Sequence, residues 1–279
     1  MSTWQFILKA WDWEPSIAIG CLLLFAGYLY LRHFRIDRHA LYFFAGDIIL
    51  LVTLVGPLDV LADDYLFSAH MLEHLILELV VPPLFLLGLP VGLVERLLSW
   101  RPAAAVERVL GIPVLAWIIG IGTLWVWHFP IFYNAALANE NIHIFQHLTF
   151  LVTATIFWWP ILAPEGYRRT TGMAAIFYLY FAALANGTLG ALLTFAPVGF
   201  YPLYLHPDNE LGALSLIRES WGLTPSADQQ LGGLFMWVLG GAIFLWAVMA
   251  VFARWYLNRE GRRTAIRSAQ AAPNTPHNG

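Results

Sequence analysis

Residues 68–90 read SAHMLEHLILELVVPPLFLLGLP, an apolar stretch long enough to cross a membrane that opens with two histidines and carries two glutamates. On an α-helix, His70, His74 and Glu78 would lie within about 80° of one another and form one stripe. An ionisable side chain inside a bilayer costs about 2.5–3.5 kcal/mol even on lenient scales, which favours a functional role for this stripe. The alternative is that the stripe only faces other helices, with hydrogen-bonded imidazoles and protonated carboxylates.

The composition of the whole chain is that of a protein that crosses a membrane several times. Of its 279 residues, 59% are hydrophobic and 12% are charged, and 13 are tryptophan. A net charge of −3 gives no support for nucleic-acid binding. The single cysteine, Cys21, excludes an intramolecular disulfide and a multi-cysteine metal site, and we interpret it as a small core residue.

Apolar runs near the length that a bilayer requires predict an all-α integral membrane protein with a seven-helix bundle. The expected spans are residues 15–32, 40–58, 68–90, 111–129, 142–163, 172–195 and 230–256. They form one membrane domain, residues 1–257, followed by a basic tail, residues 258–279, that we expect to be disordered and cytoplasmic.

Basic residues predict the orientation of this bundle, because they concentrate on the cytoplasmic side. Thirteen of the 15 Lys and Arg residues follow the first, third, fifth and seventh spans, which leaves only Lys9 and Arg218 on the other side. The amino terminus is therefore expected outside and the carboxyl terminus inside. The first segment lacks a basic leader and is expected to stay as an anchor. The loop 196–229 would lie outside, as an interfacial lid or a plain surface loop.

This topology places two His-x-x-x-His pairs at the outer membrane surface. His70 with His74 opens the third span, and His143 with His147 opens the fifth. Residues spaced in this way lie about 6 Å apart on one face of a helix, where they can bind one metal or two adjacent metals. Neutral imidazoles suit copper, zinc, iron or nickel. His128, at the outer end of the fourth span, is an accessory candidate.

Acidic residues surround the expected histidine layer. Glu73, Asp59 and Asp228 are candidates to orient the imidazoles or attract cations, and Met71 is a further accessory candidate. Asp63, Asp64 and Glu140 are better interpreted as solvated loop acids. Asp47 and Glu78 lie deeper in their spans, where they could line a polar path for protons or ions, or remain protonated and hydrogen-bonded.

The chain resembles the polytopic CtaG family of cytochrome c oxidase assembly factors, which is distinct from the single-span copper chaperone of the same name. The resemblance covers roughly residues 28–245. Its elements are Pro57-Leu58-Asp59, His70-Met71 with His74, Pro82-Pro83, Gly88-Leu89-Pro90, His143 with His147, Phe157-Trp158-Trp159-Pro160, Tyr201 to Tyr204, Asp228-Gln229, Gly232-Gly233 and Met236-Trp237.

The resemblance implies a seven-span protein of the bacterial plasma (inner) membrane that matures a haem-copper oxidase by supplying copper on the outer side. It assigns the metal to His70, His74, His143 and His147, and an acidic role to Asp228. The implied partners are haem-copper oxidase subunits, with a periplasmic copper chaperone as a further candidate, in addition to membrane lipid. No turnover chemistry is required, and the oligomeric state stays open.

Three other functions compete with this one. His70-Met71-Leu72-Glu73-His74 matches the H-x-x-E-H pattern of zinc metallopeptidases, although four histidines leave no clear open position on a zinc ion. Two imidazoles from facing helices could ligate haem, but the doubled histidines would then be unnecessary. A copper transport or resistance protein would need an ion route, for which Asp47 and Glu78 are the available deep acids.

Overall fold

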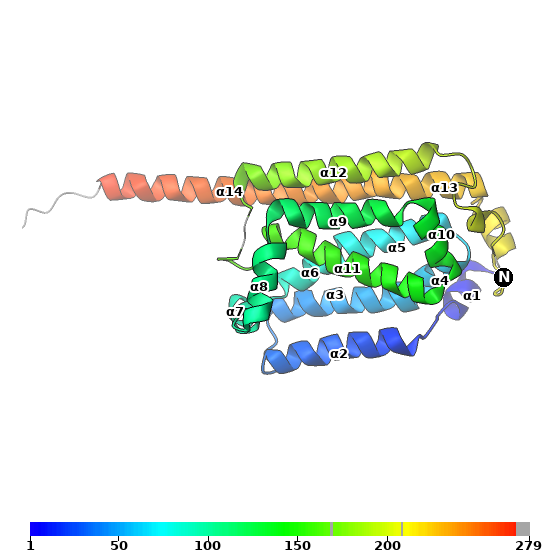
Figure 1. Ribbon diagram of the computed structural model, residues 1–279, viewed down its shortest axis with the longest axis horizontal. Coiled ribbons are helices and arrows are strands. Elements are labelled where there is room, and N and C mark those ends of the chain that lie inside the picture. The colour runs from blue at the N-terminus through cyan, green and yellow to red at the C-terminus, as the bar shows by residue number, and fades with distance from the viewer. Residues whose placement is uncertain (168–169, 208, 272–279) are drawn as a thin grey trace, which may run out of the picture.

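The computed structural model describes residues 1–167, 170–207 and 209–271, with the backbone alone for 262–271, and every regular element in these ranges is a helix (Figure 1). The all-α prediction is therefore confirmed. The elements are α1 (Thr3–Lys9), α2 (Pro15–Leu31), α3 (Arg38–Val55), α4 (Pro57–Asp64), α5 (Phe67–Leu79), α6 (Val81–Leu87), α7 (Val91–Leu98), α8 (Arg101–Leu110), α9 (Pro113–Trp127), α10 (Pro130–Ala138), α11 (Glu140–Leu162), α12 (Gly172–Phe195), η1 (Pro202–Leu205), η2 (Leu216–Ser220), α13 (Pro225–Leu234), η3 (Phe235–Leu239) and α14 (Gly240–Ala271).

Five helical segments in the described chain are long and apolar enough to cross a membrane. They are α3, the joined α5 and α6 (Phe67–Leu87), α11, α12, and the joined α13, η3 and α14 (Pro225–Gly261). Each corresponds to one of the seven spans that the sequence predicts. The protein is thus a membrane protein with at least five candidate spans.

The other two expected spans are shorter helices in the structure. α2 has 17 residues, because His33 and Phe34 adopt positive φ angles of 50° and 57° that end the helix. α9 has 15 residues and reaches the length of a span only together with α8, from which it is bent by 78°. The count of seven spans and the orientation of the chain therefore stay predictions.

Proline and short polar side chains determine where several helices begin. Proline lies in the first turn of α2, α4, α8, α9, α10 and α13, where its missing N–H costs nothing. Asp37 caps α3 by accepting the amides of His39 and Ala40 at 2.9 and 3.1 Å, and Asn139 caps α11 by accepting the amide of Ile142 at 3.2 Å. Pro57 thus ends one span and starts α4.

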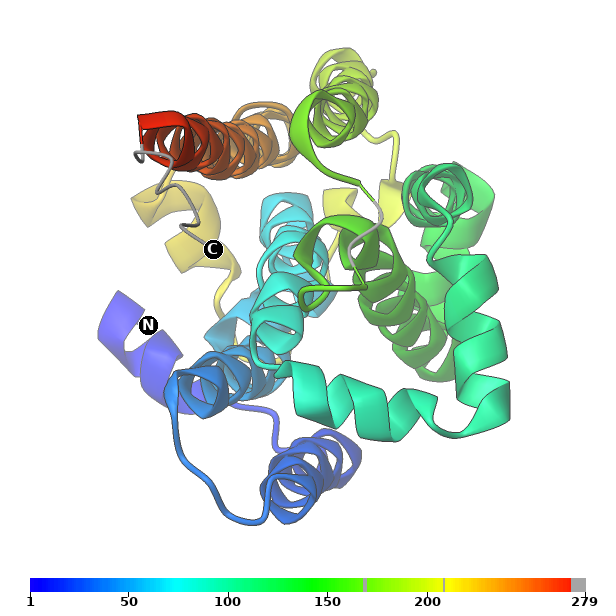
Figure 2. The same cartoon turned by 90° about the vertical axis from the view of Figure 1, so that its left-hand side faces the viewer.

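Helices α5 and α6 lie in the middle of the bundle, with α11 beside them, and α2, α3, α9, α12 and α14 surround them (Figure 2). In the joined α5 and α6, 61% of the most apolar window is buried, against 22–39% in the other four candidate spans. Polar groups on α5 are therefore removed from both lipid and water, and they must find partners inside the protein.

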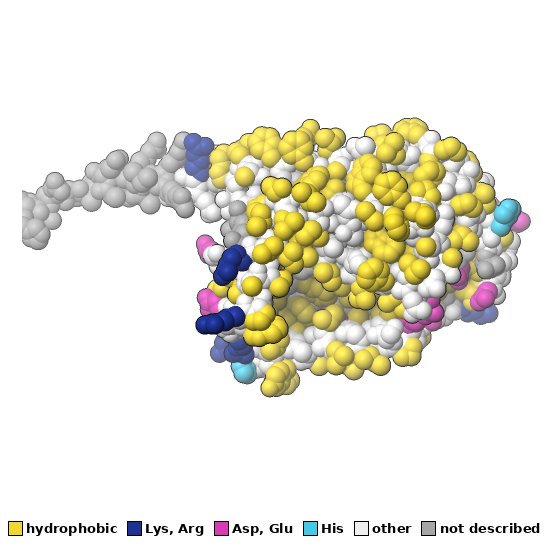
Figure 3. All heavy atoms as spheres, viewed as in Figure 1, with side chains coloured by type: hydrophobic (Ala, Val, Ile, Leu, Met, Phe, Trp, Pro, Cys, Tyr) yellow, Lys and Arg dark blue, Asp and Glu magenta, His cyan; other side chains and the backbone are white. Residues whose placement is uncertain are grey.

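The surface of the bundle divides into an apolar side and two polar ends. Apolar side chains cover the face seen in Figure 3, between the end that carries α7 and α8 and the end that carries α1, α4 and α10. Arginine side chains gather at the α7–α8 end, where Arg96, Arg101 and Arg108 lie. This is the surface pattern of a bundle surrounded by lipid.

The carboxyl-terminal segment differs in part from the expected disordered tail. Helix α14 continues to Ala271, so residues 258–271 are helical, because their alanine, arginine and glutamine residues extend the preceding helix readily. Residues 272–279 lie outside the described chain, as do Arg168 and Arg169, two of the basic residues on which the predicted orientation rests.

Close packing between α12 and α13 depends on glycine. A Cβ atom at Gly233 would lie 2.5 Å from the backbone nitrogen of Thr194, and one at Gly190 would lie 2.6 Å from the backbone nitrogen of Trp237. These positions have no space for a side chain, which is why small residues lie where the helices approach closely.

We expect Gly233→Ala to destabilise the protein by about 1–3 kcal/mol, because the added methyl group would push α13 away from α12. Gly241→Ala is the matched control, since a Cβ atom there would have no neighbour within 4 Å. Thermal unfolding of the two detergent-purified variants measures the difference. Equal unfolding temperatures would contradict the packing described.

Candidate metal centre

Five histidines from three helices meet at the end of the bundle that carries α4 and α10. His70 and His74 come from the start of α5, His143 and His147 from the start of α11, and His128 from the end of α9. Within each pair the ring centroids are 4.1 Å apart. Between α5 and α11 the shortest distances are 5.3 Å, from His70 to His143, and 5.7 Å, from His74 to His147. The structure thus brings the two predicted pairs face to face.

These imidazoles are largely removed from solvent, and most of their ring nitrogens have no hydrogen-bond partner among the described residues. His70, His74 and His128 are at most 2% exposed. Among the described residues, both ring nitrogens of His70 and His74 lack a hydrogen-bond partner, and so does Nε2 of His128, His143 and His147. Buried polar atoms without a partner are costly and rare in native proteins. Such convergent imidazole nitrogens fit the donor set of a late transition-metal ion.

His128 is held in the tautomer that a metal ligand requires. Its Nδ1 lies 2.7 Å from the carbonyl oxygen of Leu124. Because a carbonyl only accepts hydrogen bonds, Nδ1 donates, and the lone pair of the neutral ring is then on Nε2. The His128 ring centroid is 5.8 Å from that of His74, which makes His128 a fifth member of the group.

Asp63 faces the histidines, although the sequence interpretation treats it as a solvated loop acid. Its carboxylate oxygens lie 3.2 Å from Nδ1 of His143 and 4.0 Å from Nδ1 of His70. The predicted loop is wrong, because residues 57–64 form a helix, α4, although Asp63 is exposed to solvent as predicted. Asp59 and Asp63 are four residues apart on that helix and therefore share the face that packs on α5.

Glu73 on α5 lies between the histidines and the two carboxylates of α4, Asp59 and Asp63. Its Oε2 atom is 3.9 Å from Nε2 of His147, which is too long for a hydrogen bond, and the side chain is 0% exposed. Burial and the neighbouring Asp63 carboxylate raise the pKa of Asp59, which lies outside the candidate spans, to about 8. Ionisation of Asp59 is therefore disfavoured beside Asp63.

Asp228 positions α5 rather than the imidazoles themselves. Its Oδ2 atom accepts the backbone amide of Phe67 at 2.9 Å, and Oδ1 accepts the amide and the hydroxyl of Ser68 at 3.0 and 2.6 Å. The Asp228 side chain from α13 thus caps the amino-terminal end of α5. Ser68, which it binds, lies two residues before His70. Gly232, one turn further along α13, permits this approach, since a Cβ atom there would lie 2.5 Å from the Phe67 ring.

Three buried tyrosines pack against the histidine site. Tyr133 stacks on Tyr201 with a centroid distance of 3.8 Å, and its hydroxyl lies 3.2 Å from that of Tyr204. Tyr201 donates to the carbonyl oxygen of His128 at 2.7 Å. Tyr201 and Tyr204 therefore lie beside the histidine site, and the choice between a lid and a plain surface loop stays a prediction. Met71 belongs to the same apolar cluster, with Phe67 and Tyr133.

The two deep acids face different neighbours. Asp47 on α3 is buried beside the thiol of Cys21 on α2. Glu78 on α5 lines a small internal cavity of about 20 Å³ together with Gly120, Ala154 and Asn186. The structure therefore brings neither acid into the histidine group, and a polar path through both stays a prediction.

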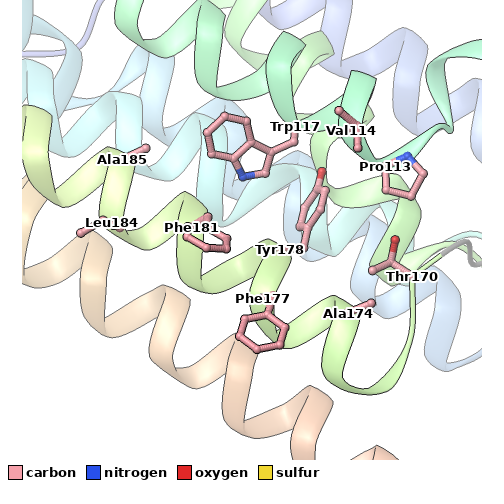
Figure 4. Close-up of a pocket in the computed structure, with 10 residues that line it drawn as sticks. All are labelled: Pro113, Val114, Trp117, Thr170, Ala174, Phe177, Tyr178, Phe181, Leu184 and Ala185. Atoms are coloured by element: carbon pink, nitrogen blue, oxygen red, sulfur yellow. The ribbon is translucent and has the colours of Figure 1, made fainter.

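A wide groove of about 670 Å³ lies between α9 and α12, away from the histidines (Figure 4). Its walls are mainly apolar, with Phe177, Phe181 and Leu184 from α12 and Val114 and Trp117 from α9. Its position on the side of the bundle and its apolar walls suit a lipid chain better than a metal ion.

We expect Asp228→Ala to destabilise the protein by roughly 1–3 kcal/mol, because two buried amides and the Ser68 hydroxyl would lose their acceptor. Asp228→Asn should lose less, since its amide oxygen can still accept one of these bonds. Thermal unfolding, with hydrogen exchange at Phe67 and Ser68, measures the effect. Asn139→Ala is the control, because Asn139 caps α11 through a single exposed bond. An equal or larger loss in this control would contradict the positioning role.

Comparison with known proteins gives one family. The sequence model of the family described as "Cytochrome c oxidase caa3 assembly factor (Caa3_CtaG)" matches residues 21–258, which include all the residues of the site. No solved structure matches the chain.

The curated relatives carry no described function. An uncharacterized protein of Mycobacterium leprae is 26% identical over 227 residues, which cover 75% of this chain and 33% of the relative. An uncharacterized protein of Mycobacterium bovis is 25% identical over 227 residues, which cover 74% of this chain and 32% of the relative. The chain thus spans about a third of the length of the curated relatives that it matches.

Proposed function

The chain belongs to the family of cytochrome c oxidase caa3 assembly factors, and from this premise we propose that it holds copper at its four paired histidines and delivers it to a haem-copper oxidase subunit. The observation that carries the proposal is the meeting of His70 and His74 with His143 and His147. Both ring nitrogens of the first pair, and Nε2 of each histidine in the second pair, have no hydrogen-bond partner in the described chain. An assembly factor with such a donor set is suited to carry a metal that the oxidase needs.

The proposal includes an orientation in the plasma membrane of a bacterium. We place the α7–α8 end, which carries Arg96, Arg101 and Arg108, in the cytoplasm and the histidine end outside. Seven crossings then result if α2 and α9 also span. At 1.5 Å per residue, α2 is about 26 Å long, close to the hydrocarbon thickness of about 30 Å.

Copper is favoured by the donor atoms. Five imidazoles and no thiolate suit copper or zinc, and copper binds more tightly than other divalent first-row metals at nitrogen sites. Transfer needs no bond-making chemistry in the protein, because a partner with a better donor set can take the ion by ligand exchange. The partners would be oxidase subunits, with a periplasmic copper chaperone as the donor.

Metal analysis of detergent-purified protein tests the site. After loading with copper or zinc and removal of excess metal, the wild type should retain copper. The variant with alanine at His70, His74, His143 and His147 should lose it, because the ligands are gone. His206→Ala, which removes an exposed histidine of the outer loop, should behave like the wild type. Equal, near-zero copper in all three would contradict copper binding, and preferential retention of zinc would favour a zinc protein.

A deletion strain tests the role in assembly. Oxidase activity should fall when copper is limiting, because fewer oxidase molecules would acquire their metal. The wild-type gene and the His206→Ala variant should restore the activity, whereas the four-histidine variant should not. Unchanged oxidase activity in the deletion strain under copper limitation would contradict the assembly role.

A further inference from the structure

Three carboxylates meet beside the histidines, on the side of α5 that α4 covers. Asp59 and Asp63 come from α4 and Glu73 comes from α5. One oxygen atom of each lies within 4.8 Å of an oxygen of the other two. Two oxygen ligands of one divalent cation can be up to about 5 Å apart, since metal–oxygen distances are about 2.0–2.6 Å. The three carboxylates are therefore close enough to bind one ion together.

Glu73 is the member of this group that most needs a partner. Its side chain is 0% exposed, and the carboxyl group of Asp59 is the one hydrogen-bonding neighbour of its oxygens among the described residues. A buried carboxylate whose neighbours are other acids is poorly compensated, because ionised Asp59 and Asp63 would add repulsion. A cation bound among the three would compensate Glu73 and both aspartates at once.

We propose that Asp59, Asp63 and Glu73 form a second cation site, beside the histidine site, that takes a divalent cation of the oxygen-preferring class, such as Mn²⁺, Mg²⁺ or Ca²⁺. The ligand atoms decide the class, because carboxylate oxygens suit these hard cations, whereas the imidazoles suit copper. The inference goes beyond the proposed function, since the carboxylates bind their cation whether or not the histidines carry copper.

Asp63 connects the two sites. It belongs to the carboxylate group and to a second group with His70 and His143, in which the ligand atoms also lie within 4.8 Å of one another. Its side chain is 37% exposed, so water can reach the cation and complete its coordination. The bound cation holds the Asp63 carboxylate beside His143, and thereby orients that imidazole for the metal in the histidine site.

Manganese binding to the full-length, detergent-purified protein tests the inference, because Mn²⁺ is paramagnetic and prefers oxygen ligands. The wild type, loaded first with Cu(I), should still bind Mn²⁺. Asp59→Asn, which keeps the shape of the side chain, should weaken Mn²⁺ binding about tenfold or more, because one of the three carboxylate ligands is lost. Glu140→Gln, the matched control, removes an exposed acid outside the site and should leave Mn²⁺ affinity unchanged.

Two further measurements keep the test decisive if Asp59→Asn does not fold. Mn²⁺ should raise the unfolding temperature of the wild type, and the four-histidine variant should still bind Mn²⁺. No Mn²⁺ binding by the wild type, equal affinity in Asp59→Asn, or displacement of Mn²⁺ by stoichiometric copper would overturn the inference. Mn²⁺ binding without copper binding would instead contradict the proposed function and leave this inference standing.

Discussion

A polar atom that is removed from water must find a partner, and this requirement governs the end of the bundle where α5 and α11 begin. Imidazoles from three helices and carboxylates from two meet there, and most of the imidazole nitrogens have no hydrogen bond within the described chain. The cost of burying such groups is several kcal/mol each unless something compensates them. The two proposed cation sites would compensate both kinds of donor, nitrogen beside oxygen.

The rest of the fold keeps these groups in place. Asp228 on α13 fixes the first turn of α5, and Gly232 lets α13 approach closely enough for this contact. Pro57 ends α3 and starts α4, which turns two acids toward α5. The tyrosines of the segment 196–229 pack against the site, so the ligands are shielded on one side by protein and on the other by the membrane-embedded bundle.

The sequence predicts much of this arrangement, because helical spacing and apolar length are local properties. They place five of the seven expected spans correctly. The predicted topology also puts His70, His74, His143 and His147 at the same end of the bundle. Asp63 is missed, since its role depends on α4 being a helix that packs on α5. The part played by Asp228 could not be predicted either, because the contact joins residues 160 positions apart in the chain. The length of α2 depends on the positive φ angles of His33 and Phe34, which no sequence pattern predicts.

The central claim is that α5 and α11 together bind one kind of metal through imidazoles. X-ray absorption spectroscopy of the copper-loaded protein tests this claim most directly, because the scattering of imidazole rings is distinct from that of water, carboxylate or sulfur. The account predicts copper surrounded by several imidazoles, with the imidazole signal reduced when either His70 and His74 or His143 and His147 are replaced. A copper spectrum without imidazole scattering, or one that stays the same when either pair is replaced, would contradict it.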